Sequence, residues 1–478
     1  GKLNSEEELQ NRLQEERLAR ATRTAPPDRD LFGGWSAGPQ REATGWFRTE
    51  KIDNQWWLIT PEGKLFFSLG LDCVGFGERT FVEKREAWFD WLPAKEEEPF
   101  HQIYAKGSGA HSYADPIGGK GRTFNFHLAN IIRKYGKDWL ELWSEEALTR
   151  MKDWGFNTLG TWSNWDLLHR TDMPFVVWSG FWGIKVIESS TGYWSKMVDV
   201  FDESFPRQVE KAVAGITSSW KDEPLCIGYF FDNELAWEGV QNGVLSSAPD
   251  QAARQVFIAW LRQRHGDLKV LNQAWESHFE RWEEVRGTGS PTAAFDRDMS
   301  DFLYCFAQRY FTVIKEILQQ YDPNHLYLGC RFATAPPEVI RACSEQADVL
   351  SFNLYYNSLP ANYLADISME DKPVMIGEFH FGSLDRGMFH TGLAGAGDQA
   401  ERARLYKDYV ESVLAHPAFV GCHWFQWVDQ PVTGRWKDGE NYNIGFLDVT
   451  DTPYAELVDT ATELHGRAYE YRYSLREE

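Results

Sequence analysis

Two glutamates that end apolar runs are the residues of this sequence best suited to acid–base chemistry. Glu234 closes the run CIGYFFDNE, and Glu378 closes the run VMIGE. A pair of carboxyl groups can hydrolyse a glycosidic bond, because one protonates the leaving oxygen while the other attacks the anomeric carbon or activates a water. At a separation of about 5–5.5 Å the second carboxylate attacks directly and configuration is retained. A lone glutamate is usually a solvated or salt-bridged rim residue, but two at strand ends predict a catalytic pair.

The fold that must bring these glutamates together is predicted from a rhythm of strands and helices that begins at residue 66. Apolar runs predict eight strands, over residues 66–71, 158–162, 175–178, 226–232, 326–331, 349–355, 374–378 and 420–426. Helical patterns fall between most of them, over residues 137–154, 203–219, 252–264 with 296–320, 337–345 and 399–415. Eight such units predict an α/β fold of the (β/α)₈ TIM-barrel type. Strands four and seven then lie on opposite sides of the ring, so their end residues face each other across its mouth.

A doubly wound open sheet is the alternative architecture. It is disfavoured because no Gly-x-Gly-x-x-Gly loop follows the first strand, where LDCVGFG stands at 71–77. Residues 1–65 predict a helical arm and a small β-hairpin extension, and residues 66–478 the catalytic barrel. Long excursions over residues 72–136 and 235–295 are expected to form rim loops, which are usually functional at this length.

The side-chain alternation of a strand gives a further expectation for each glutamate. In the fourth strand it places Glu234 on the face of Gly228 and Cys226, opposite the bulky Ile227, Tyr229 and Phe231. In the seventh strand Glu378 shares a face with Val374 and Ile376, which fits an inward-pointing carboxylate less well.

Composition limits the partners of the chain. Its 478 residues carry a formal net charge of −22, so phosphate backbones and anionic lipid surfaces are repelled and a neutral substrate is favoured. The 22 Trp indicate either stacking platforms for sugar rings or a large aromatic core. No stretch is apolar enough for a membrane helix. The sequence has no His-Glu-x-x-His and no Gly-x-Ser-x-Gly motif, so we expect no metal and no cofactor.

Four segments resemble the β-agarases of glycoside hydrolase family 50, within the clan A retaining hydrolases. They are YFFDNELAW at 229–237, GEFHFG at 377–382, HWFQWVDQP at 423–431 and GENYNIGF at 439–446. The resemblance runs from about residue 40 to 465. It implies hydrolysis of β-1,4 bonds in agarose or its oligosaccharides, with Glu234 as acid/base and Glu378 as nucleophile. It also implies that Asn233 holds the substrate 2-hydroxyl and that Tyr355 orients the nucleophile.

Further residues are predicted to contact the sugar. Trp424 on strand eight is expected to be a platform, and only one of Trp424 and Trp427 can face the mouth if the strand continues. Arg331, at the end of strand five, is expected to meet substrate or the nucleophile. The other candidates are Trp162, Asn164, His380, Asp429, Glu440 and Asn441. Core packing is an equal alternative for Trp162, helix capping for Asn164 and a structural role for His380.

Two rival functions remain open at this level. One is a β-galactosidase or a hydrolase of another galactan, such as porphyran or carrageenan fragments; the other is a barrel that binds sugar without catalysis. The resemblance suggests a secreted or periplasmic protein, although the first residues lack the apolar core of a signal peptide. The sequence does not fix bond specificity, endo or exo action, or oligomeric state.

Overall fold

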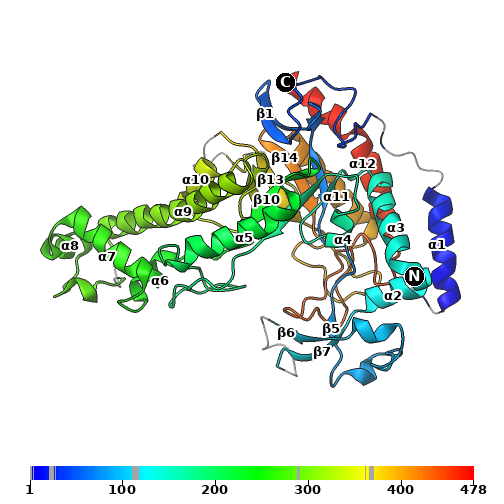
Figure 1. The fold of residues 1–478 in the computed structure, drawn as a ribbon, viewed down its shortest axis with the longest axis horizontal. Helices are drawn as coiled ribbons and strands as arrows, with labels where there is room; N and C mark the ends of the chain where they lie inside the picture. Colours follow the sequence, from blue (N-terminus) through cyan, green and yellow to red (C-terminus); the bar gives the residue numbers. More distant parts are fainter. Residues whose placement is uncertain are drawn as a thin grey trace.

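The computed structural model describes residues 3, 5–20, 26, 28–109, 118–287, 291–360, 362–364 and 371–477. Its centre is one curled sheet of eight strands (Figure 1). These strands are β4 (Ser68–Leu71), β8 (Thr158–Leu159), β9 (Phe175–Ser179), β10 (Cys226–Phe231), β11 (Leu326–Tyr327), β12 (Leu350–Asn353), β13 (Val374–Phe379) and β14 (Phe419–Trp424). Each one overlaps a predicted strand, and β9, β13 and β14 extend one residue beyond the predicted range, so the α/β class is confirmed.

The strand order of this sheet is β11-β10-β9-β8-β4-β14-β13-β12, and all neighbours are parallel. The first and last strands in chain order, β4 and β14, are therefore paired, which a doubly wound sheet does not allow. Beyond β11 the backbone of Phe332 donates to Ser351 O at 2.9 Å and accepts from Asn353 N at 2.8 Å. These two bonds connect the chain after β11 to the other end strand, β12.

Helices cover the outside of the sheet, and a small apolar cluster fills its inside. The outer helices include α3 (Trp139–Asp153), α5 (Ser204–Trp220), α10 (Pro337–Gln346), α11 (Gln399–Ala415) and α12 (Ala455–Ser474). The inner cluster contains Val176, Leu328, Met375 and Val420, together with Leu58 of an N-terminal antiparallel sheet. That sheet comprises β1 (Arg48–Ile52), β2 (Gln55–Ile59) and β3 (Leu65–Phe66), so the division predicted after residue 65 falls inside β3.

The side-chain alternation along β10 differs from the predicted one. Its pairing with β9 shifts register between Cys226 and Gly228, and this irregularity moves Ile227 into the inner cluster. Tyr229 and Phe231 remain in the outer core. The prediction that Ile227 shares their face is therefore wrong, because a bulge breaks the period of two.

The glutamate of β13 owes its orientation to a similar irregularity. The pairing of β13 with β14 shifts between Ile376 and Phe379. Val374 and Ile376 belong to the outer core, whereas Glu378 lines the cleft described below. The strict alternation that grouped these three residues therefore does not hold at the end of this strand.

Two excursions extend the rim, as their lengths predicted. The first contains the small antiparallel sheet of β5 (Thr80–Phe81), β6 (Ala105–Ser108) and β7 (Lys120–Phe124). The second is a helical arm that projects far from the sheet (Figure 1). It consists of α6 (Val240–Ser246), α7 (Ala252–His265), α8 (Leu268–Trp275) and α9 (Ala293–Tyr321). We call α6 to α9 the arm.

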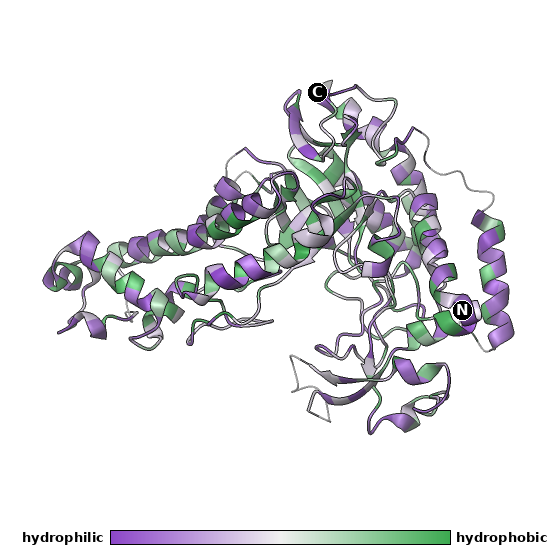
Figure 2. Cartoon of the chain, viewed as in Figure 1, coloured by the Kyte–Doolittle hydropathy of each residue, from purple (hydrophilic) through white to green (hydrophobic). Residues whose placement is uncertain are grey.

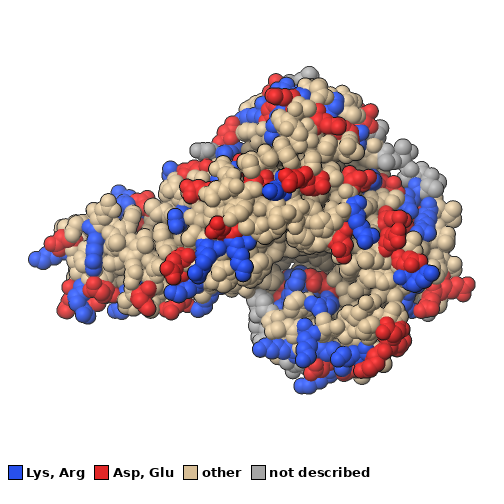
Figure 3. All heavy atoms as spheres, in the orientation of Figure 1, with Lys and Arg blue, Asp and Glu red and all other residues tan. Residues whose placement is uncertain are grey.

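Among the described residues, five α-helices were not predicted. They are α2 (Phe126–Tyr135), α4 (Trp165–Leu168), α6, α8 and α12, whereas α1 (Glu6–Arg20) matches its helical pattern. Figure 2 shows hydrophobic residues gathered on the central strands and mostly hydrophilic ones along α1. Basic and acidic side chains are interspersed over the face drawn in Figure 3. Among the described residues, no helix combines the length and apolarity that a membrane span requires.

Candidate active site

A cleft of about 1040 Å³ lies where the strands of the sheet end, and both glutamates line it. Its wall is rich in rings. The aromatic residues that line it are Phe76, Trp162, Trp178, Phe181, Trp182, Tyr193, Trp194, Tyr355, Phe425 and Tyr442. Flat apolar faces beside carboxylates are the surfaces that a sugar ring requires, because its C–H face stacks on rings while its hydroxyls bind polar groups.

Glu378 sits near the end of β13 in a buried, ion-paired position. Its Oε1 accepts from Arg331 Nη2 at 2.8 Å, and its other oxygen accepts from the Tyr355 hydroxyl. Burial raises the pKa of this carboxyl to about 7; Arg331 opposes the rise, while Glu234 and Asp72 add to it. The carboxylate is therefore held at both oxygens, and its charge depends on its acidic neighbours.

Glu234 follows β10 in a half-buried position with neutral partners. Its Oε1 accepts from Asn353 Nδ2 at 2.9 Å, and its Oε2 accepts from the indole N–H of Trp194 at 3.2 Å. The backbone here is in the left-handed region, with φ of 51°. Its N–H donates to Arg331 O at 3.2 Å, which ties the turn after β10 to the chain after β11.

A chain of hydrogen bonds joins the surroundings of the two glutamates. Asn233 Oδ1 accepts from Arg331 Nε at 2.9 Å and from Asn353 Nδ2 at 3.2 Å. Because Arg331 also binds Glu378 and Asn353 also binds Glu234, the two carboxylates share one network. Gly377 is needed beside it, since a Cβ there would lie 2.7 Å from Asn353 Oδ1.

Asp72 and Asn353 are parts of this network that the sequence analysis did not single out. Asp72 directly follows β4, is wholly buried and accepts from Arg331 Nη2 at 2.9 Å and from Thr161 N at 2.8 Å. Asn353 is the last residue of β12. Both obey the strand-end rule that revealed the glutamates, so a search for any polar residue at a strand end would have found them.

Four more of the predicted site residues line the cleft, and a fifth, Arg331, lies behind one of them. Asn233, Trp162, Tyr355 and Glu440 line it, and Arg331 lies behind Trp162 with its guanidinium 4.6 Å from the ring centre. Arg331 is wholly buried and contacts Glu378, which is one of the two contacts expected for it.

Two further cleft residues are largely occupied by local structure. Asn164 caps α4 (Trp165–Leu168) by accepting from Leu167 N at 3.2 Å. His380 Nε2 accepts from Leu393 N at 2.9 Å, and burial lowers the pKa of this histidine to about 3. The ring of His380 is thus neutral, with one nitrogen already used by the backbone, which favours the structural alternative.

The expected platform Trp424 is not in the cleft, and this prediction is corrected. Trp424 is wholly buried, donates to Ile444 O at 2.8 Å and packs edge-on against Phe379 and Tyr406. The strand ends at Trp424 with this ring on the helix side, so the next residue, Phe425, lines the cleft instead.

Three more predicted contacts also lie away from the cleft lining. Trp427 is buried against Trp154. Asp429 is buried and accepts from Tyr454 at 2.6 Å and from Gly445 N at 2.8 Å, so it holds the loop after β14 together. Asn441 donates to the backbone of the same loop at 3.3 Å. These residues stabilise the rim rather than face a substrate.

No group of three His, Cys, Asp or Glu side chains is arranged to hold a metal ion within the part of the chain that the structure describes.

Comparison with known proteins identifies the class of this site. A family model described as β-galactosidase matches residues 193–363. β-Agarase B of Vibrio sp. (strain JT0107) is 33% identical over 515 residues, which cover 99% of this chain and 53% of that protein. A solved exo-β-agarase structure is 36% identical, with a TM-score of 0.92 over 99% of this chain and 72% of that one. The agarase AgWH50C is 35% identical, with a TM-score of 0.90 over the same shares.

The chain belongs to the glycoside hydrolases. It belongs to the β-agarase family of these enzymes. It spans about half the length of the curated β-agarases that it matches, 53% of one and 50% of the other.

Proposed function

We propose that this chain is a retaining hydrolase of β-1,4-galactosidic bonds in agarose or agaro-oligosaccharides, as a member of glycoside hydrolase family 50. The observation that carries the proposal is the pair of glutamates in one cleft with unlike partners. Glu378 is held by a cation and a phenol, which suits an attacking carboxylate. Glu234 is held by neutral N–H donors, which suits a group that exchanges a proton.

In the first step Glu378 attacks the anomeric carbon while Glu234 protonates the departing oxygen. In the second step Glu234 takes a proton from a water whose oxygen attacks the anomeric carbon. The bond to Glu378 breaks, and the sugar leaves with its configuration retained. Glu234 contributes to the raised pKa of Glu378, because each carboxylate disfavours a charge on the other. Arg331 and Tyr355 oppose this rise and stabilise the charged form of Glu378.

We further propose that the sheet is a closed (β/α)₈ barrel, with the bonds of Phe332 linking β11 to β12. In this proposal residues 1–65 form an N-terminal extension and residues 66–478 the catalytic barrel. Asn233 binds the 2-hydroxyl of the sugar, and Trp162 and Phe425 provide ring faces beside it. The neutral galactan is the partner, in a cleft that needs no cofactor for this chemistry.

A β-galactosidase is the second candidate, because the family model that matches residues 193–363 carries that description. Incubation with neoagaro-oligosaccharides, lactose and porphyran or carrageenan oligosaccharides separates the candidates by product. Release from none of them would favour a sugar-binding barrel without catalysis. Product configuration followed by NMR should show retention, and inversion would contradict the proposed mechanism.

The assignment of the two glutamates is tested by substitution and rescue. Glu378→Gln should bind oligosaccharide but lose nearly all turnover, since amide nitrogen cannot attack the anomeric carbon. With an aryl glycoside whose acidic phenol departs without protonation, added azide should restore the activity of Glu234→Ala, because the anion attacks the intermediate without a general base; it should not restore Glu378→Gln. Full activity in either variant ends the assignment.

A further inference from the structure

A hairpin over residues 185–199 reaches over the cleft after β9. Its two arms are joined by the bridge between Val186 and Val198 and by Ile187 N donating to Met197 O at 2.8 Å. Its tip is tight at Gly192, where a Cβ would lie 2.1 Å from Ser195 O and 3.1 Å from Ala236 Cβ. The tip therefore packs on the chain two residues past Glu234.

This hairpin is fastened to the helical arm by hydrogen bonds of two residues. Gln251, just before α7, donates to Asp199 Oδ2 at 2.6 Å and to Val186 O at 3.3 Å, and accepts from Glu188 N at 3.2 Å. Asp199 also accepts from Ala253 N at 3.0 Å. The arm, α6 to α9, thus holds both sides of the hairpin through residues that are far from the hairpin in the sequence.

Trp194, next to the tip, is a residue of the hairpin that contacts Glu234. It lines the cleft, is 37% exposed and donates its indole N–H to Glu234 Oε2 at 3.2 Å. Asn353 occupies the other oxygen of Glu234, so Oε2 is the oxygen that Trp194 selects. An acid that gives up its proton gains negative charge in the transition state, and a donor aimed at that oxygen binds the charged form more tightly than the neutral one.

The charged groups around this contact come from several elements. Glu378 and Tyr355 lie on the nucleophile side of Glu234. On the side of Trp194, the Arg435 guanidinium lies 6.0 Å from its ring centre, and Glu440 forms an ion pair with Arg435 at 2.8 Å. Arg435 is thus paired within its own loop, and Trp194 is the N–H donor that the hairpin contributes to Glu234.

We propose that Trp194 is a positioning residue for the acid/base Glu234 and a wall of the site for the leaving sugar, held in place by the helical arm through Gln251 and Asp199. This inference rests on the proposed function, because it gives Glu234 the role of proton donor. The leaving sugar departs from the side on which the acid stands, and the Trp194 ring is the surface next to that oxygen. The donor stabilises the charge that Glu234 gains in the first step, so its effect depends on how much the leaving oxygen needs a proton.

Trp194→Phe tests the donor while it keeps an aromatic face, and Trp165→Phe is the matched control. Trp165 is also a half-exposed tryptophan, but it lies on α4 outside the cleft lining. With an agaro-oligosaccharide, Trp194→Phe should lower kcat about tenfold with little change in KM, as expected for one lost hydrogen bond to a charged group. The alkaline limb of its pH–rate profile should move up by about one pH unit, because a donor to the ionised form is lost. Trp194→Ala should also raise KM, since the ring face is gone.

A change of leaving group separates this role from a structural one. An aryl glycoside of the same sugar with an acidic phenol departs without protonation, so Trp194→Phe should hydrolyse it at close to the wild-type rate. A merely structural defect would slow both substrates equally. Gln251→Met removes the hydrogen bonds that the Gln251 side chain makes between arm and hairpin and keeps a similar shape. It should lower the rate on the agaro-oligosaccharide relative to the rate on the aryl glycoside by about threefold, in the same direction as Trp194→Phe.

The outcomes distinguish this inference from the proposed function. If the wild type is active and loses activity in Glu378→Gln, but Trp194→Phe matches Trp165→Phe in pH profile and in both substrates, the positioning role is overturned. If the wild type and Glu378→Gln behave alike, the proposed function itself fails. Thermal unfolding of each variant shows that it is folded, and equal slowing of both substrates by Trp194→Phe also overturns the role.

Discussion

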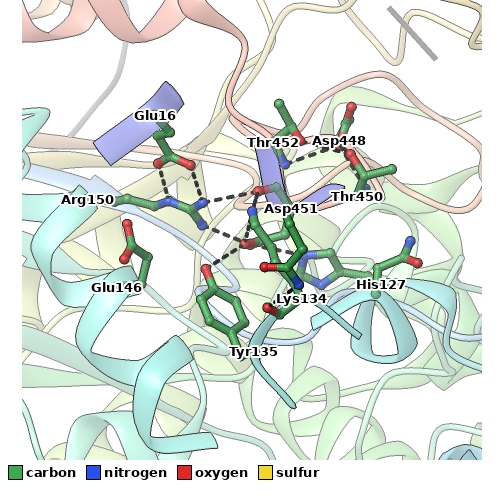
Figure 4. A network of polar contacts seen from close by, with 12 residues as sticks. Glu16, His127, Lys134, Tyr135, Glu146, Arg150, Asp448, Thr450, Asp451 and Thr452 are labelled. Carbon is green, nitrogen blue, oxygen red and sulfur yellow. Dashed lines mark hydrogen bonds and ion pairs between the residues drawn. The ribbon is translucent and has the colours of Figure 1, made fainter. Parts of the chain in front are cut away.

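Two buried arginines, each between two carboxylates, hold different regions of this molecule. Arg331 binds Asp72 and Glu378 behind the cleft. Arg150, on α3, binds Glu16 of α1 through two bonds of 2.7 Å and Asp451 at 2.8 Å (Figure 4). Both guanidinium groups are wholly buried, so burial alone does not distinguish the network at the cleft from the structural one.

The difference lies in how fully each arginine is satisfied. Around Arg150 every nitrogen has a carboxylate or backbone partner, and Asp451 is also bound by Lys134 at 3.0 Å and by Tyr135 at 3.1 Å (Figure 4). Around Arg331, Nη1 and Asn353 Oδ1 make no hydrogen bond to any described residue.

The charges differ in the same way. Burial alone would raise the pKa of Asp451, but Arg150 and Lys134 outweigh it, and the pKa falls well below the usual value. The pKa of Glu378 is instead raised to about 7. The structural network favours the charged form of Asp451, whereas burial and the acidic neighbours of Glu378 disfavour its charge.

Exchange of each arginine for methionine is the sharpest way to break this comparison. Arg331→Met and Arg150→Met should each lower the free energy of unfolding by about 3–5 kcal/mol, because each removes a buried cation that pairs with two carboxylates. Below its melting range, Arg150→Met should keep most of its activity, and Arg331→Met should lose about a thousandfold, since Glu378 loses its orienting cation. Chemical denaturation and initial rates at low temperature measure both effects. Similar activities in the two variants would remove the distinction between the networks.

The sequence predicted the strand ends and their two glutamates better than it predicted the aromatic residues that other segments position. The eight strands and the two glutamates follow from local patterns, since strand ends carry the site in such sheets. The direction of Trp424 could not be predicted, because it depends on where β14 ends and on Tyr406 of α11. Trp194 was missed because its hairpin is placed by Gln251, which belongs to a distant excursion.

The pH dependence of stability should have opposite signs in the two networks. The folded-state pKa of Glu378 is raised from 4.5 to about 7, so its contribution to stability is present below pH 4.5 and is lost as the pH rises through 7. The free energy of unfolding of Glu378→Gln, measured relative to that of the wild type, should therefore rise by about 3 kcal/mol between pH 4.5 and 8.

Asp451→Asn is the counterpart. Because the pKa of Asp451 is lowered in the folded state, its contribution is present above pH 3.8 and is lost as the pH falls through the folded value. The deficit of Asp451→Asn should be constant above pH 5 and should shrink below pH 4. Urea titrations of the three proteins at several pH values measure these slopes, and parallel curves for both variants would contradict the assigned charges.

The smallest expected effect concerns how the structural network holds α1. Glu16, 12% exposed, pairs with Arg150, whereas Glu6 on the same helix is 73% exposed and pairs with Arg133. Glu16→Gln should lower the free energy of unfolding by about 1 kcal/mol and leave catalysis unchanged, because Arg150 keeps Asp451. Glu6→Gln should change neither, since an exposed pair contributes little. Hydrogen exchange along α1 should rise in Glu16→Gln alone; equal exchange in both variants would mean that Leu9 and Leu13, which are buried, hold this helix without the help of Arg150.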